Sequence, residues 1–288
     1  MEIAQQTGNQ QATLWNGHAG HAWVETQARL DLIFEPFKDM LVEAVSRAAR
    51  RRVLDVGCGT GGTTLAVGVL LGANGQCTGI DISEPMIAAA RARAEREGIA
   101  ARFLRDDAQV HAFEAASFDM IISRFGVMFF DDPIQAFANL RRAATDEAEM
   151  RLIAWRTPEE NPFMTTAERA AAKLLPNLPV RRPDEPGQFG FANRHRVQKI
   201  LQESGWAGID IQPIDVACTL PESELVTYLT RLGPVGVMLQ EADDRTRAEV
   251  IETVRPAFDS YVHGSEVRFS AACWMISARA SGAQTDPR

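Results

Sequence analysis

The stretch VLDVGCGTGG, residues 53–62, constrains the fold more than any other part of the chain. Apolar residues surround one acid, Asp55, and glycine then occupies alternate positions at Gly57, Gly59 and Gly61. This pattern is typical of a buried strand that ends in a tight turn before a helix, because glycine tolerates unusual backbone angles and lets the backbone approach a ligand. The sequence therefore predicts a ligand site at the end of its first strand.

Strand-like and helix-like patterns alternate on either side of this stretch. Two strands of the same sheet that are joined through a helix run parallel, because the parallel return needs a crossover. We therefore expect a Rossmann-like, doubly wound α/β fold with a seven-stranded, mostly parallel sheet, an antiparallel last strand and helical cover segments. The expected strands are residues 51–57, 76–82, 101–108, 118–125, 147–156, about 208–219 and 268–280.

The alternation stops after Arg156, which suggests that cover segments interrupt the core. Prolines and a short helical pattern follow, and a second helical stretch separates the last two expected strands. The predicted organisation is a disordered tail (1–12), an N-terminal helical cap (13–48), the ligand-binding core (49–156), an inserted cover (157–192), the C-terminal part of the core (193–280) with a helical insertion (222–257), and a disordered tail (281–288).

Composition narrows the classes of partner. The formal net charge of −8 disfavours binding to nucleic acid or to anionic membrane surfaces. The four cysteines show no CxxC spacing, the first residues lack the pattern of a signal peptide, and no apolar run has the roughly 18 to 20 residues that a membrane span requires. We expect a cytoplasmic protein that acts on a small molecule, with no nucleic acid or membrane partner; a homodimer is left open.

Two ligands compete for the glycine turn. Gly57, Gly59 and Gly62 satisfy the GxGxxG pattern of dinucleotide sites, with Asp81 two dozen residues further on, so an NAD(P)-dependent oxidoreductase is one interpretation. Asp55 favours the other, because a carboxylate beside a helix N-terminus opposes a diphosphate and attracts an amino group or a cation.

With Asp55 in front of GxGxG, the sequence resembles the class I S-adenosylmethionine-dependent methyltransferases of the small-molecule type. The resemblance implies transfer of a methyl group from S-adenosyl-L-methionine, with S-adenosyl-L-homocysteine as product, to an oxygen or carbon of a small, apolar or aromatic acceptor, oxygen being favoured. A protein of this fold that uses the cofactor without methyl transfer is a further alternative.

The resemblance also assigns roles to residues. Asp81 would accept hydrogen bonds from the ribose, Ile82 and Met86 would flank the adenine, and Asp107, or Asp106 one position earlier, would lie near the adenine amine. Tryptophans before the first strand would stack near the adenosyl group or face the sulfonium. The full set of expected cofactor residues is Trp15, Trp23, Asp55, Gly57, Cys58, Gly59, Gly61, Asp81, Ile82, Met86, Asp107, Ala108, Ser123 and Phe125.

The segment LWNGHAGHAWV, residues 14–24, supplies the candidate general base. His18 or His21 would take the proton of a hydroxyl acceptor, because histidine titrates near neutral pH. No further ligand accompanies this HxxH pair, so no metal is expected. For Asp131 and Asp132 helix capping is the favoured interpretation. The expected lining of the acceptor pocket is Phe163, Met164, Phe189, Phe191, Tyr228, Leu232 and Met238.

Overall fold

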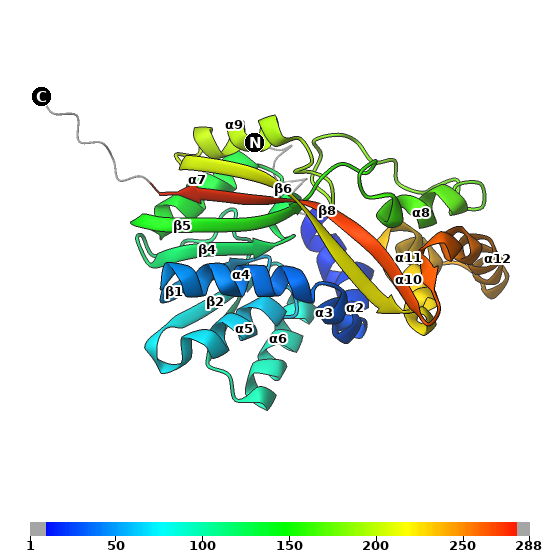
Figure 1. Cartoon of the computed structure of the whole chain (residues 1–288), viewed down its shortest axis with the longest axis horizontal. Coiled ribbons are helices and arrows are strands. Elements are labelled where there is room, and N and C mark those ends of the chain that lie inside the picture. Colours follow the sequence, from blue (N-terminus) through cyan, green and yellow to red (C-terminus); the bar gives the residue numbers. More distant parts are fainter. Residues whose placement is uncertain (1–9, 281–288) are drawn as a thin grey trace, which may run out of the picture.

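The computed structural model describes residues 10–280, which build one mixed sheet flanked by helices (Figure 1). The strands lie in the order β3-β2-β1-β4-β5-β8-β6, and β7 pairs with β8. Strands β1 to β5 are mutually parallel, whereas β8 runs antiparallel to both β5 and β6. The strands are β1 (Arg52–Val56), β2 (Gln76–Asp81), β3 (Ala101–Arg105), β4 (Phe118–Arg124), β5 (Ala144–Trp155), β6 (Ala207–Pro221), β7 (Val262–His263) and β8 (Glu266–Arg279).

The seven predicted strands and the antiparallel last strand are confirmed, and β7 is additional. This strand has two residues and pairs Val262 with Val267 across a turn that contains Gly264. An element this short has no alternation of apolar and polar residues, so the sequence pattern could not reveal it.

Helices cover both faces of the sheet. The strand order reverses between β1 and β4, so right-handed crossovers place the helices that follow β1 and β2 on one face and the helix that follows β4 on the other. The first face carries α4 (Glu35–Ala48), α5 (Gly62–Leu71) and α6 (Glu84–Glu97), and the second carries α7 (Pro133–Ala143) and α9 (Arg194–Glu203) (Figure 1).

Local signals set the ends of these helices. The hydroxyl of Ser83 accepts from the backbone N–H of Met86 at the start of α6, and Gly98 ends the helix in the left-handed conformation. Asp132 accepts from Gln135 N at 3.0 Å and begins α7, which confirms the capping interpretation for this acid.

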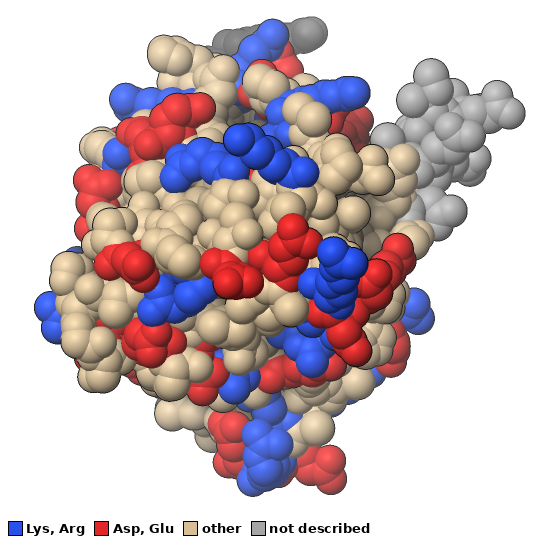
Figure 2. Space-filling model, turned by 90° about the vertical axis from the view of Figure 1, so that its right-hand side faces the viewer, with Lys and Arg blue, Asp and Glu red and all other residues tan. Residues whose placement is uncertain are grey.

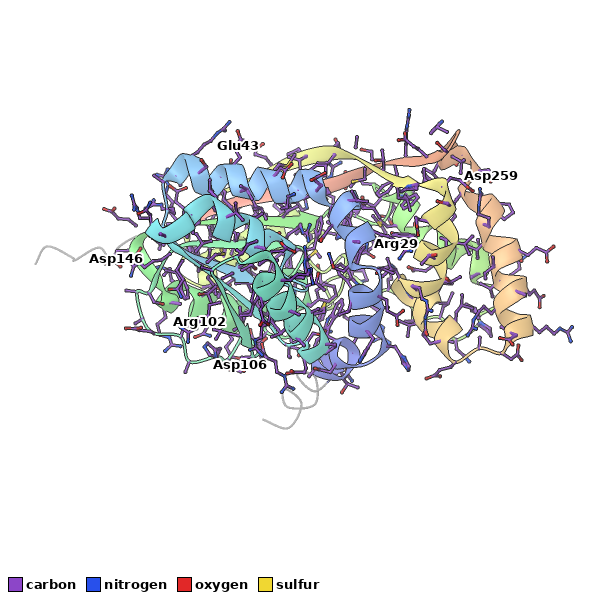
Figure 3. All side chains as sticks on the ribbon, turned by 90° about the horizontal axis from the view of Figure 1, so that it is seen from below. Arg29, Glu43, Arg102, Asp106, Asp146 and Asp259 are labelled. Atoms are coloured by element: carbon purple, nitrogen blue, oxygen red, sulfur yellow. The ribbon has the colours of Figure 1, made fainter. Side chains whose placement is uncertain are left out.

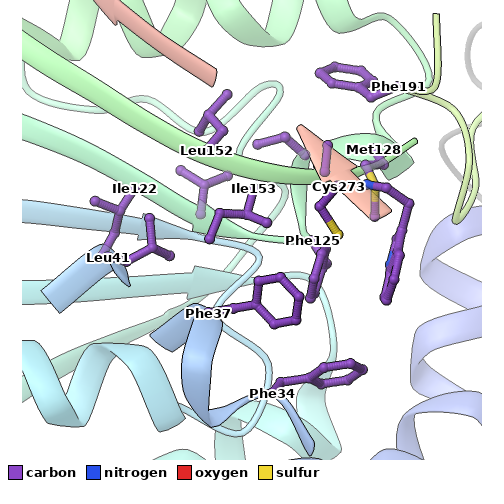
Figure 4. Close-up of a cluster of buried hydrophobic side chains, with 14 of the residues drawn as sticks. Phe34, Phe37, Leu41, Ile122, Phe125, Met128, Leu152, Ile153, Phe191 and Cys273 are labelled. Atoms are coloured by element: carbon purple, nitrogen blue, oxygen red, sulfur yellow. The ribbon is translucent and has the colours of Figure 1, made fainter. Parts of the chain in front are cut away.

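The core forms where the N-terminal helices pack on the centre of the sheet (Figure 4). Phe37 and Leu41 of α4 are fully buried against β4 and β5, close to Ile122 and Ile153. Phe34, just before α4, continues this apolar surface toward the carboxyl ends of the strands. The buried residues of α4, Phe37, Leu41 and Val45, recur at helical spacing and form the surface that faces the sheet.

A second group of helices lies beyond the carboxyl ends of the strands (Figure 1). Strands β6 and β8 stay paired from Ala207↔Arg279 to Pro221↔Glu266, well past the end of β5, and carry these helices on their extended arm. Phe163 of the first cover segment stacks on Phe269 of β8 with ring centroids 3.9 Å apart, and it also meets Phe258 of the second cover segment with centroids 5.2 Å apart. The cover consists of α8 (Pro162–Ala171), η3 (Glu222–Glu224), α10 (Leu225–Arg231), α11 (Gly233–Gln240), α12 (Asp244–Val254) and η4 (Arg255–Tyr261).

The N-terminal segment joins the sheet to the cover. Helices α2 (His18–Glu25) and α3 (Gln27–Ile33) cross the carboxyl edge of the sheet, where α2 contacts both α6 and α11. Arg29 of α3, labelled in Figure 3, forms an ion pair with Glu224 of η3. Residues 10–12 of the predicted N-terminal tail are helical, whereas 1–9 and the predicted tail at 281–288 lie outside the described residues.

The outer surface carries both signs of charge. On the cover end seen in Figure 2, Lys and Arg side chains are interspersed with Asp and Glu. Within residues 10–280, no helix combines the length and the apolar character that crossing a membrane would need.

We expect Leu41→Ala to lower the free energy of unfolding by about 2 to 5 kcal/mol, because the buried side chain would leave a cavity between α4 and the sheet. The matched control is Leu32→Ala, since Leu32 is 61% exposed and Leu41 is 0% exposed. We expect that control to change stability by less than about 0.5 kcal/mol. Urea unfolding measures both, and equal losses in the two variants would contradict the described packing.

Candidate functional site

A cavity of about 470 Å³ opens at the carboxyl ends of β1, β2 and β4, where the strand order reverses. Open α/β sheets bind ligands at this point. One half of the wall comes from the sheet and includes Gly57, Asp81 and Asp107. The other half comes from the cover and includes Phe163 and Tyr228. The cavity therefore joins a polar wall to an apolar wall.

The glycines of the turn fall into two groups, one that lines the cavity and one that allows α5 to pack. Gly57 and Gly59 line the cavity, and both have positive φ angles. Gly61 does not line it: this residue is the N-cap of α5, with φ +83°, and a Cβ there would lie 3.0 Å from the ring of Phe103. The structure corrects the expectation for Gly61, which lets α5 pack against β3. Cys58 is buried and borders only a small side pocket beside the cavity.

Asp81 is a carboxylate of the main wall. Its Oδ2 accepts from Gly59 N at 2.8 Å and its Oδ1 accepts from Ser83 N at 2.9 Å. Burial raises the pKa of Asp81 even though these backbone bonds favour the charged form. Each oxygen can accept a further hydrogen bond, so the side chain is held in place and remains able to bind a pair of hydroxyls.

The end of β3 provides the next part of the wall. Ala108 lies there together with both alternative acids, Asp106 and Asp107. Asp107 Oδ1 accepts from Gln109 N at 2.9 Å, whereas Asp106 Oδ2 lies 2.6 Å from the Nδ1 atom of His111. Burial raises the pKa of Asp107. Ile82 and Met86 line the cavity. Asp131, for which helix capping was expected, also lines the cavity, because the capping residue of α7 is Asp132.

Asp55 lies behind the glycine turn, and the structure corrects the expectation that it faces the cavity mouth. Its side chain is 1% exposed and accepts a hydrogen bond from Thr64 Oγ1 at 2.6 Å. It borders the small side pocket but not the main cavity. Burial raises the pKa of Asp55 to about 6, although the bond from Thr64 and the charge of Arg124 act in the opposite direction.

Ser123 is also removed from the cavity wall. Its hydroxyl donates to the carbonyl oxygen of Val56 at 2.7 Å and accepts from Gly126 N at 3.1 Å, so it ties the end of β4 to the end of β1. Phe125 does line the cavity and has φ +64°, which is unusual for a bulky residue. Its ring stacks on Trp155 with centroids 4.6 Å apart.

The N-terminal helices bring their tryptophans to the cavity and leave their histidines outside. Trp15 and Trp23 line the cavity, with ring centroids 6.0 Å apart, and Ser83 Oγ donates to Trp15 O at 2.6 Å. His18 and His21 are exposed and absent from the wall, which removes the structural basis for either as a general base. Helical spacing explains the difference, because residues 11, 15, 19 and 23 share one face.

Arg124 is a site residue that sequence reasoning missed. It lines both the cavity and the side pocket, and its Nη1 donates to Phe34 O at 3.2 Å. Burial lowers the pKa of this guanidinium, while the nearby carboxylates of Asp31 and Asp55 act to raise it. Asp31 also pairs with Arg93 at 2.9 Å. An arginine at the end of a buried strand is a usable signal, since arginine is rarely buried without a partner.

The cover half agrees with most of the predicted lining. Phe163, Met164, Tyr228, Leu232 and Met238 line the cavity. Two expected residues do not: Phe189 packs under Arg181, whose guanidinium carbon is 4.8 Å from the ring centroid, and the ring of Phe191 packs against Phe137. The part of the chain that the structure describes holds no cluster of three His, Cys, Asp or Glu residues arranged for a metal ion.

Comparisons with known proteins relate this chain to methyltransferases. The sequence model of the methyltransferase domain family matches residues 53–147. Demethylmenaquinone methyltransferase from Staphylococcus aureus (strain JH9) is 35% identical over 184 residues, which cover 61% of this chain and 73% of that protein. Aklanonic acid methyltransferase from Streptomyces sp. (strain C5) is 34% identical over 106 residues, which cover 36% of this chain and 48% of that protein. The chain spans about half the length of the first relatives found.

Among solved structures, the YcgJ protein from Bacillus subtilis superimposes with a TM-score of 0.56 at 18% identity. The match covers 85% of this chain and 98% of that one. At this identity the likeness shows the fold alone, and it supports the sheet order and helix layers described above.

We expect the stability difference between Asp55→Asn and the wild type to depend on pH. The pKa of Asp55 is raised from its ordinary value of 3.8 to about 6, so the folded protein holds this proton more tightly than the unfolded chain. The wild type therefore loses stability relative to the variant as pH rises from about 4 to about 6, by up to about 3 kcal/mol. Urea unfolding at several pH values measures this, and a constant difference would contradict the buried position of Asp55.

Proposed function

This chain belongs to the class I S-adenosylmethionine-dependent methyltransferases, and we propose that it moves the methyl group of S-adenosylmethionine to an oxygen or carbon atom of a small apolar or aromatic molecule. One observation carries the proposal: a single cavity joins the wall that contains Asp81 to the apolar wall that contains Tyr228. A cofactor and an acceptor bound to these two walls would meet without water between them.

The sheet wall suits the adenosine part of the cofactor. Asp81 would accept from both ribose hydroxyls; in support, each of its oxygens is held by one backbone N–H and can accept a second hydrogen bond. Ile82 and Met86 provide apolar surface for the adenine, and Asp107 provides an acceptor for its amino group. These assignments follow the family pattern, residue by residue, onto positions that line the cavity.

The side pocket suits the amino acid part. It is bordered by Arg124, Asp31, Asp55 and Thr63 of the first turn of α5. A carboxylate would be favoured by Arg124 and by the N-terminus of α5, and an ammonium group by the two acids. Asp55 thus keeps the attraction for a positive group that its position before the glycines suggested, but from behind the turn.

The cofactor, when bound, supplies a methyl group that is already activated by the positively charged sulfur. The protein's own residues then position and shield the reactants. Trp15 and Trp23 close the cavity from the N-terminal side, while Phe125 and Trp155 lie between the two walls. No histidine occurs among the described residues that line the cavity. We therefore attribute catalysis to the positioning of the reactants and the exclusion of water, and not to a histidine base.

The rival use of the glycine turn, a dinucleotide site, meets an acid at the third glycine of GxGxxG. A Cβ at Gly62 would lie 2.8 Å from Asp31 Oδ1, and a carboxylate there opposes a diphosphate.

The other rival function is cofactor binding without methyl transfer, and a labelling experiment distinguishes it from the proposed function. Radioactive methyl that moves from S-adenosylmethionine into an extractable organic product supports transfer, and its failure with a broad set of aromatic acceptors favours the rival.

We expect Asp81→Asn to raise the dissociation constant for S-adenosylmethionine by about tenfold or more, because it removes a charged acceptor from the ribose. Asp146→Asn is the matched control, since Asp146 is exposed and lies at the opposite end of the sheet (Figure 3). Calorimetry with S-adenosylmethionine and with NADH measures the effect and the choice of ligand. Tight binding of NADH alone would overturn the proposed function.

We expect Trp23→Ala to weaken binding of S-adenosylhomocysteine by about tenfold, because it removes an aromatic wall of the cavity. His18→Ala, on the same helix but on its exposed side, is expected to leave the affinity within about twofold. Calorimetry on both variants tests the described orientation of α2. A larger loss for His18→Ala than for Trp23→Ala would show that the helix presents its other face to the cofactor.

A further inference from the structure

The apolar half of the cavity contains a hydroxyl with a weak partner. Tyr228 of α10 lies on the cavity wall, and its hydroxyl donates to the thioether sulfur of Met164 at 3.4 Å. A thioether is a poor hydrogen-bond acceptor compared with an oxygen. The surroundings are apolar: Phe163 has its ring centroid 5.7 Å away, and Leu232 and Met238 belong to the same wall.

The charged side chains of this half have partners of their own. Arg181 Nε donates to Glu168 Oε2 at 2.8 Å, and Arg181 also bonds to Gln188. Arg231 lies 3.6 Å from Glu25 and bonds to Gln240. Because these charges are balanced by neighbours, the wall favours an uncharged molecule over an ion.

Burial keeps the Tyr228 hydroxyl protonated. Removal from water raises the pKa of Tyr228, and the nearby Cys218 and Glu168 act in the same direction. The group is therefore a neutral donor at all ordinary pH values. A buried donor gains free energy when a ligand offers an oxygen in place of a sulfur.

We propose that the cover half of the cavity binds a flat, uncharged aromatic molecule and that the Tyr228 hydroxyl donates a hydrogen bond to an oxygen of that molecule, which selects acceptors with a hydroxyl or carbonyl group. The aromatic side chains that line the cover half of the cavity favour a planar ring as ligand, because aromatic rings pack well on one another in edge-to-face and offset-stacked arrangements. The inference rests on the proposed function and names the acceptor class of the same site.

The experiment compares two ligands that differ by one oxygen, 2-naphthol and naphthalene, by calorimetry on protein saturated with S-adenosylhomocysteine. We expect the wild type to bind 2-naphthol about tenfold more tightly than naphthalene. Tyr228→Phe should reduce this preference to within about twofold while the affinity for naphthalene stays unchanged. Tyr261→Phe is the matched control, because the other tyrosine of the chain packs on Phe163 but does not line the cavity. It should keep the full preference.

A second variant tests whether the cover half of the cavity is the binding site, independently of the Tyr228 hydroxyl. Leu232→Trp would fill the space next to Tyr228, so we expect it to abolish binding of both naphthalene compounds and to leave the affinity for S-adenosylhomocysteine unchanged.

Two results would overturn the inference: an undiminished preference in Tyr228→Phe, or no binding of 2-naphthol to the loaded wild type. Both leave the proposed function intact if S-adenosylhomocysteine binds. Failure of S-adenosylhomocysteine to bind would instead count against the proposed function, and the same titrations on unloaded protein would still test Tyr228.

Discussion

The backbones that follow β1 and β4 approach each other so closely that side chains are excluded between them. A Cβ at Gly57 would lie 2.5 Å from Gly126 Cα, and a Cβ at Gly126 would lie 2.5 Å from Val56 O. Ser123 holds this contact by bonding to both segments. The close approach places the glycine turn and Phe125 side by side at the reversal of the strand order, so the cavity and its aromatic boundary both follow from it.

Asp55 and Asp81 occupy similar positions in the sequence but differ in how deeply they are buried. Asp55 and Asp81 each lie at the end of a parallel strand, yet Asp55 is covered by the turn and bonds to Thr64, whereas Asp81 is held at the cavity wall by two backbone N–H groups. An acid under the turn acts on a ligand through its field, and its own charge is costly to bury. An acid on the wall can contact a ligand directly.

Much of the fold could be predicted because strands and helices alternate with clear boundaries, as at Ser83 and Gly98, and because Asp81 stands at the end of a recognisable strand. The features that could not be predicted depend on which way a side chain points and how deeply it is buried. Ser123 faces a neighbouring backbone rather than the cavity, and His18 lies on the outer side of a helix whose inner side carries Trp23. Arg124 passed unnoticed because its role depends on Asp31, which lies far away in the sequence.

The arm formed by β6 and β8 allows the cover helices to vary in sequence and length without disturbing the sheet. The cover helices 222–261 leave the sheet at Pro221 and return at Glu266, which are paired neighbours on adjacent strands. Residues can be inserted, lost or exchanged within 222–261 without shifting the register between β6 and β8. The turn after β1 lies on another part of the chain, so changes in 222–261 can reshape the wall that contains Tyr228 while the glycine turn keeps its geometry.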